Sequence, residues 1–181
     1  MNRTWWAMFA VAALLAPAAR AGTIGVGGGV FGGMSFPVLQ DDQGQGPVFG
    51  ARIPVRLAAL FAVEPFYSTS ALGDKTIETS PGFSVTREGS DVTTYGVNAL
   101  FPFGTKTLLY PFLGIGSAHF ERDGQDETFT SYDLGLGLGV TLIPKLMLDL
   151  RGEMQAASSG ETSRKMFNVT LGATYSIFST P

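Results

Sequence analysis

The sequence predicts an all-β protein, an eight-stranded antiparallel up-and-down transmembrane β-barrel, and three observations lead to this fold class. Apolar residues alternate with small or polar ones along eight segments, and a two-residue period is that of a strand. Hydrophobic residues make up 45% of the 181 residues and charged residues only 15%, against about 25% in a typical soluble domain. Beyond the N-terminal segment, no apolar run reaches the roughly 18 residues of a membrane helix.

Residues 1–21 have the layout of a secretory signal peptide. Arg3 supplies a positive charge, residues 5–18 are apolar, and Ala19-Arg20-Ala21 fits an A-x-A cleavage site. The apolar stretch is shorter than the roughly 20 residues that a spanning helix needs. We therefore expect cleavage after residue 21, which leaves residues 22–181 as one barrel domain.

The alternation is clearest in residues 132–142, where tyrosine, leucine and valine take one parity and glycine, aspartate and threonine the other. A strand places each of these sets on its own face. Most of the segments have about ten residues, the length that crosses a bilayer when a strand is tilted. The predicted strands are 23–33, 47–57, 61–68, 93–101, 108–119, 132–142, 146–155 and 166–177.

The predicted connections alternate between short turns and long polar loops, as is typical of an outer-membrane barrel. The short connections are 58–60, 102–106 and 143–145, and the long ones are 34–46, 70–91, 121–128 and 156–164. Because the number of strands is even, both termini lie on the side of the short turns. We expect that side to face the periplasm and the long loops to be extracellular.

The placement of charge predicts which face meets lipid. A soluble carrier barrel would be apolar inside and charged outside, whereas a membrane barrel has these faces inverted. Seven charged residues fall within the predicted strands, and all lie on the polar face. Three cations and four anions suit a closed interior, where buried charges must be paired. The sequence thus predicts a lumen ion-pair network of Arg52, Arg56, Glu64, Asp133, Asp149, Arg151 and Glu153.

Glycines share the polar face with these charges, so large side chains are expected to meet small ones across the lumen. With a turn near Pro144, residues 149–153 fall opposite residues 135–139. Across another hairpin, Glu64 falls within diagonal reach of Arg56. Because the interior of an eight-stranded barrel can be filled by side chains, we expect a plugged barrel.

The aromatic residues of the apolar face lie near the predicted strand ends, where the membrane interfaces favour them. Tyrosine and phenylalanine are also good strand formers, so this observation alone is weaker than the sorting of charge. Toward the long loops lie Tyr67, Tyr95, Tyr132 and Phe167, and toward the short turns Phe61, Phe101 and Tyr175.

Two segments resemble a known family. Residues 110–116 read Y-P-F-L-G-I-G, and Thr170, Gly172, Tyr175 and Ile177 fit the pattern polar-x-Gly-x-x-aromatic-x-apolar. Over nearly all of residues 22–178 the chain resembles the small bacterial outer-membrane β-barrel domain family, of the eight-stranded opacity-protein and OmpX-like type. The resemblance implies that the second pattern is an assembly signal for the barrel-assembly machinery. Many members end at an aromatic residue, whereas three more residues follow Phe178 here.

Few motifs suggest chemistry. Residues 27–32 fit G-x-G-x-x-G, but a dinucleotide site needs a helix after them, and a polar loop follows. The chain has no cysteine and a net charge of −3, which excludes thiolate sites and gives no footprint for nucleic acid. Asp123, Asp126 and Glu127 in one loop and Asp41-Asp42 in another are expected to form a solvated acidic rim, since no D-x-D-x-D-G spacing occurs. No cofactor or metal is therefore expected.

The weak catalytic candidates are Ser117, His119 and Glu121, because some outer-membrane lipid A deacylases place these residue types on the outer wall near the loops. Successive same-face residues of one strand lie about 6.5–7 Å apart, whereas a nucleophile and its base need about 3 Å. The order of serine and histidine is also reversed relative to those enzymes. We therefore predict no enzyme activity.

The predicted function is that of an integral protein of the bacterial outer membrane, with a structural or surface-interaction role and no catalysis. We expect a monomer whose partners are outer-membrane lipids, lipopolysaccharide and the assembly machinery. Three alternatives stay open: a lipid-modifying enzyme, a soluble periplasmic carrier and a narrow pore. The sequence does not identify a ligand, and it does not indicate whether residues 70–91 are ordered.

Overall fold

The computed structural model describes residues 24–38, 43–80, 83–122, 124–160 and 162–179, so the predicted signal peptide lies outside the described residues. In this part of the chain, no helix is long and apolar enough to cross a membrane. The strands are β1 (Gly25–Val38), β2 (Gly46–Arg52), β3 (Val55–Ala58), β4 (Phe61–Ala71), β5 (Lys75–Ser80), β6 (Phe83–Arg87), β7 (Asp91–Leu100), β8 (Phe103–Gly104), β9 (Thr107–Arg122), β10 (Gln125–Ile143), β11 (Leu146–Ser158) and β12 (Ser163–Ser179).

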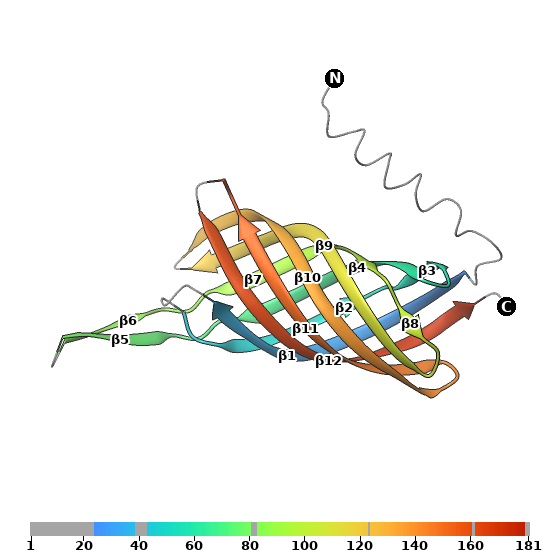
Figure 1. The fold of residues 1–181 in the computed structure, drawn as a ribbon. Helices are drawn as coiled ribbons and strands as arrows, with labels where there is room; N and C mark the ends of the chain where they lie inside the picture. Colours follow the sequence, from blue (N-terminus) through green and yellow to red (C-terminus); the bar gives the residue numbers. More distant parts are fainter. Residues whose placement is uncertain (1–23, 39–42, 81–82, 123, 161, 180–181) are drawn as a thin grey trace, which may run out of the picture.

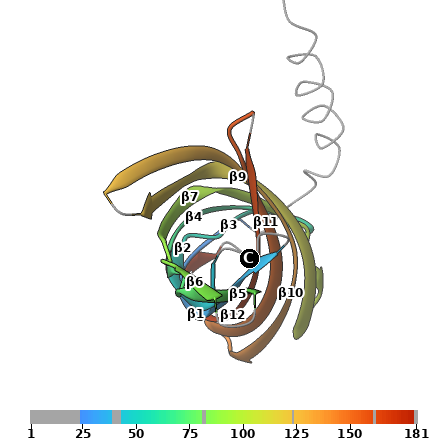
Figure 2. The same ribbon diagram turned by 90° about the vertical axis from the view of Figure 1, so that its left-hand side faces the viewer.

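These strands close into a barrel, which confirms the predicted fold class (Figures 1 and 2). Around the wall, β1 is followed by β2 with β3, then β4, β7, β9, β10, β11 and β12, and β12 pairs with β1 again. Every pairing in this circle is antiparallel. Since β2 and β3 lie end to end between β1 and β4, the wall has eight positions, as predicted.

A proline divides the second wall position into β2 and β3. Pro54 has no N–H to donate, so it cannot contribute fully to the ladder. Its carbonyl still accepts a hydrogen bond from the Gly27 amide at 2.9 Å, and the Ile53 amide donates to the Pro65 carbonyl at 2.9 Å. The wall therefore stays continuous where the sequence predicted a single strand, 47–57.

The two ends of the barrel carry different connections. We call the end with the β3–β4, β7–β9 and β10–β11 connections the turn end; Gly25 and Ser179, near the first and last described residues, pair there. The opposite end is the loop end. Within the predicted loop 70–91, β5 and β6 form a separate two-stranded hairpin. In Figure 1 this hairpin extends away from the barrel at the loop end.

Two predicted long loops are wrong, because the strands continue through them. β9 and β10 occupy most of 121–128, with Gly124 in the turn at φ +73°, and β11 and β12 leave only residues 159–162 of the loop 156–164. β1 likewise runs to Val38, inside the predicted loop 34–46. Above a membrane, a strand can carry polar residues on both faces, so polarity there does not mark its end.

The sorting of side chains between the two faces follows the predicted parity. Leu134 and Leu136 point outward and are 66% and 51% exposed, while Arg52 is 2% exposed inside the barrel. The predicted aromatics Tyr67 and Tyr95 are direct cross-strand neighbours on the outer face. Tyr132 also faces outward. Because β10 begins at Gln125, this tyrosine lies seven residues below the loop end of its strand.

Candidate functional site in the barrel interior

Four charged side chains from three wall strands form what we call the charged ring: Arg52 of β2, Glu64 of β4, and Asp149 and Arg151 of β11. Arg151 donates to Glu64 through both terminal nitrogens, at 2.6 and 2.8 Å, and through Nε to Asp149 Oδ2 at 3.0 Å. Arg52 donates to Asp149 Oδ1, and its Nε lies 3.9 Å from Glu64 Oε2. All four are buried. The ring is electrically neutral, so each buried charge faces opposite charges.

Aromatic side chains surround the ring. The Tyr110 hydroxyl donates to Asp149 Oδ2 and accepts from Arg151 Nε at 3.0 Å. The Arg151 guanidinium also lies 5.1 Å from the centre of the Tyr110 ring and 5.3 Å from that of Phe112, and Arg52 lies 5.4 Å from that of Phe31. Such cation–π contacts stabilise desolvated cations. The sequence did not predict these roles, although the alternation in 108–119 puts Tyr110 and Phe112 on the polar, inward parity.

Glycines make the room that the ring and its aromatics need. A Cβ on Gly172 would overlap the Arg52 guanidinium and lie 2.7 Å from Asp149 Oδ1, and one on Gly137 would overlap the Tyr110 ring. The predicted register across the β10–β11 hairpin is confirmed, with Gly137 opposite Arg151. The side chains that cover the β10 glycines at 135 and 137, however, are the β9 aromatics and not the β11 charges.

The other predicted network residues lie apart from the ring. Arg56 is exposed and lines a cavity of about 500 Å³ at the turn end, whose wall also includes Glu64 and Arg151. Asp133 and Glu153 lie on the loop side of the ring. Asp133 Oδ1 accepts from the Ser131 hydroxyl at 3.0 Å, and Glu153 Oε1 accepts from Asn168 Nδ2 at 3.2 Å.

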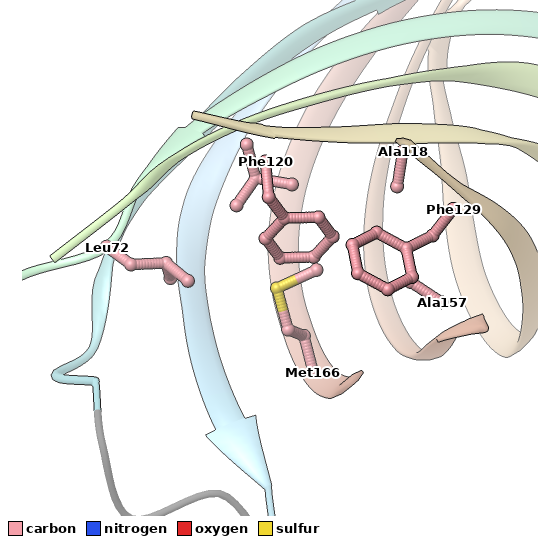
Figure 3. Close-up of a cluster of buried hydrophobic side chains, with 7 residues drawn as sticks. Leu72, Ala118, Phe120, Phe129, Ala157 and Met166 are labelled. Atoms are coloured by element: carbon pink, nitrogen blue, oxygen red, sulfur yellow. The ribbon is translucent and has the colours of Figure 1, made fainter. Parts of the chain in front are cut away.

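An apolar cluster, which the sequence did not predict, occupies the interior near the loop end (Figure 3). The Phe120 and Phe129 rings meet edge to face at 5.2 Å. Arg164 lies 4.6 and 5.4 Å from these two ring centres and donates to Glu127 at 2.8 Å. The sequence would have predicted that the cluster residues point inward only if the strands had been extended through the polar segments. The cluster consists of Leu72, Val92, Ala118, Phe120, Phe129, Ala157 and Met166.

The catalytic candidates lie on the outer face of β9 and do not form a triad. His119 Nδ1 lies 2.8 Å from the Thr128 hydroxyl, Nε2 lies 3.4 Å from the Tyr95 hydroxyl, and the His119 and Tyr95 rings are stacked. Both ring nitrogens therefore already have partners. Ser117 and Glu121 are two positions away along the same strand, and Ser117 stands opposite Tyr95.

Nor do the described parts of the predicted acidic rim form a single cluster. Glu127 pairs with Arg164, and Asp126 stands opposite Glu121 across the β9–β10 ladder. Asp123, Asp41 and Asp42 lie outside the described residues. Among the residues that are described, no three His, Asp or Glu side chains come together as a metal site.

The four residues of the predicted assembly signal lie on β12 and divide between its faces. Thr170 and Gly172 point inward and are buried, while Tyr175 and Ile177 point outward and are exposed. Gly172 is the glycine over which the Arg52–Asp149 ion pair lies. One residue of the pattern therefore also serves the barrel interior.

A closed antiparallel barrel with an apolar outer wall and buried ion pairs inside is a membrane-spanning β-barrel. The family model "Outer membrane protein beta-barrel domain" matches residues 6–176, and the chain belongs to this family of the bacterial outer membrane. No curated protein sequence matches the chain.

Three solved structures share the fold. Neisserial surface protein A is 13% identical, with a TM-score of 0.65 over 85% of this chain and 98% of its own. Ail, the attachment invasion locus protein of Yersinia pestis, is 21% identical, with a TM-score of 0.51 over 87% and 100%. The N-terminal barrel domain of Pseudomonas aeruginosa OprF is 15% identical, with a TM-score of 0.54 over 86% and 98%.

Proposed function

We propose that this protein is a non-conducting surface-interaction protein, whose barrel anchors the loop-end strands on the outside of the outer membrane. The proposal is supported by two layers of buried side chains inside the barrel. The charged ring joins β2, β4 and β11 across the interior, and the apolar cluster occupies the loop side. Together these two layers oppose the passage of ions.

The surface role is supported by the structure at the loop end. The β5–β6 hairpin is held at its base, where the Leu72 amide donates to the Ser90 carbonyl and the Ser90 hydroxyl accepts from Gln43 at 2.7 Å. The Gly89 amide donates to Asp74 at 2.8 Å. A hairpin fixed in this way presents a defined surface at little cost in conformational entropy. The similar barrel from Yersinia pestis is an attachment protein by name, which is consistent with such a role.

The orientation belongs to the same proposal. We place the loop end outside the cell and the turn end, with both termini, in the periplasm, since short turns are periplasmic in this class of barrel. The proposed surroundings are outer-membrane lipids and lipopolysaccharide, the barrel is a monomer, and the assembly machinery inserts it through the β12 pattern.

Planar-bilayer recordings test the closed lumen. We expect no conductance steps from the purified protein. A variant with Phe129→Ala and Met166→Ala removes bulk from the apolar cluster and is also expected to stay silent, because the charged ring remains. Regular conductance steps from the unmodified protein would support the narrow-pore alternative instead.

Replacing residues 75–87 by a short glycine linker tests the surface role. We expect cells with this variant to attach less to protein-coated surfaces, while the barrel keeps its heat-dependent gel mobility. Protease treatment of intact cells should cleave a site inserted at residues 81–82 and spare one in the β10–β11 turn. Undiminished attachment would leave a structural role, and the reverse cleavage pattern would overturn the orientation.

A further inference from the structure

Two lumen carboxylates remain after the charged ring is accounted for. The ring holds two cations and two anions, so Asp133 and Glu153 are two further acidic groups on its loop side that no ring cation pairs with. Asp133 is 3% exposed. Since Asp133 stands opposite Gln155, it is the diagonal neighbour of Glu153 across the β10–β11 ladder. Two inward carboxylates this close in a low-dielectric interior require compensation.

Unused oxygen atoms converge beside Asp133. Asp133 Oδ2 and Asn98 Oδ1 are both buried and accept no hydrogen bond from any described residue. Asn98, Gly114 and Asp133 are consecutive neighbours across β7, β9 and β10. A Cβ on Gly114 would overlap Asn98 Oδ1 and lie 3.2 Å from Asp133 Oδ2. Both oxygens therefore point into the space that this glycine leaves.

Two amide groups beside these carboxylates already donate to other partners. Gln155 Nε2 donates to Ser131 at 3.0 Å and lies 3.3 Å from Thr94 Oγ1, and Asn168 Nδ2 donates to Glu153. The guanidinium of Arg151 is directed to Glu64 and Asp149. What remains is a set of acceptor oxygens with an excess of negative charge, which is the environment that a hard cation selects.

We propose that the lumen binds one divalent cation of the Ca²⁺ class between the charged ring and the apolar cluster. Asp133 Oδ2, Asn98 Oδ1 and the Glu153 carboxylate are its protein ligands, Asn168 orients Glu153, and water completes the coordination. The site lies between two filled layers of the interior, so the ion enters as the barrel folds and exchanges slowly afterwards.

The test compares protein purified from envelopes with the same protein unfolded and refolded in detergent with a chelator. After gel filtration with EDTA, we expect elemental analysis to find one bound divalent ion per native barrel. The chelator-refolded barrel should hold none, and refolding with Ca²⁺ should raise its unfolding temperature by about 5 °C. Native protein without bound metal, and with no Ca²⁺-dependent shift on refolding, would overturn the proposal and indicate neutral carboxyl groups.

Matched variants separate this site from the surface acids. Asp133→Asn and Glu153→Gln should abolish the retained ion, and Asn98→Ala should weaken it about tenfold, with folding checked by heat-dependent gel mobility. Asp126→Asn, at the exposed loop end, should retain the ion and the temperature shift. If a carboxylate variant fails to fold, Asn98→Ala alone decides the matter, because it leaves the lumen charge unchanged. Full retention in all folded lumen variants would contradict the site.

Discussion

The inner and outer faces of the barrel wall are built under different rules. Inside, each large side chain has particular partners: Arg151 meets Glu64, Asp149 and two aromatic rings, and Gly172 has the Arg52–Asp149 pair directly over it. Outside, Leu134 and Leu136 are exposed on the wall that faces lipid. The difference shows that the inner face requires specific shapes and charges, whereas the outer face requires only apolar character.

The largest expected effect comes from breaking the charged ring. Arg151→Ala leaves Glu64 and Asp149 buried without their shared cation, and we expect a loss of about 3–5 kcal/mol in the free energy of unfolding. Urea unfolding of the refolded barrel in lipid vesicles measures it. The double variant Arg151→Met with Glu64→Gln should recover part of the loss, because it removes one charge of each sign. A single variant as stable as the unmodified protein would show that the ring is not needed for stability.

A charge on the outer face is expected to lower the free energy of unfolding nearly as much as the loss of Arg151. Leu136→Arg places a charge in the middle of the apolar band and should cost about 2–4 kcal/mol, measured in the same unfolding experiment. Leu142→Arg, close to the turn end of β10, is the depth control and should cost about 0–1 kcal/mol. Equal losses at the two positions would contradict the assignment of the membrane-spanning band.

On the inner face, a small increase in side-chain volume should lower the stability of the barrel. Gly172→Ala adds one methyl group below the Arg52–Asp149 pair, and overpacking of this kind costs about 1–3 kcal/mol. Because Gly172 is also part of the predicted assembly signal, refolding in vesicles without the assembly machinery isolates the packing effect. Normal stability in vitro with poor insertion in cells would assign the residue to assembly alone.

On the outer face a change of shape should have almost no effect. Leu134→Ile changes the branching of a lipid-exposed side chain, and a change within about 0.5 kcal/mol is expected. A loss as large as that of Gly172→Ala would remove the distinction between the faces.

The smallest effect is expected at the enzyme candidate. His119→Ala should leave the cell's lipid A unchanged, since the ring nitrogens of this histidine meet Tyr95 and Thr128 and not Ser117. Mass spectrometry of lipid A from cells with and without the substitution shows whether a lipid A modification depends on His119. Loss of a lipid A modification on substitution would restore the enzyme hypothesis.

The sequence predicted what depends on parity and on short distances along the chain. The alternation in 132–142 predicted which residues face lipid, and the turn near Pro144 predicted the pairing of Gly137 with Arg151. The contact between Arg151 and Glu64, 87 residues apart, was not predictable. It depends on the stagger with which the barrel closes, and that stagger is a property of all the strands together. The apolar cluster was missed because Phe120 and Phe129 flank residues 121–128, whose polarity suggested a loop.

Among the described residues, one end of β10 has a single neighbouring strand. Its ladder with β11 stops at Thr130 opposite Ser158, while its ladder with β9 continues to Gln125 opposite Arg122. The backbone of residues 125–129 is therefore a free sheet edge in water, which could recruit a strand of another molecule. Asp126 stands opposite Glu121 beside this edge, and repulsion between these acidic side chains and those of a second copy makes such recruitment costly, so the exposed edge resists aggregation without a bilayer to cover it.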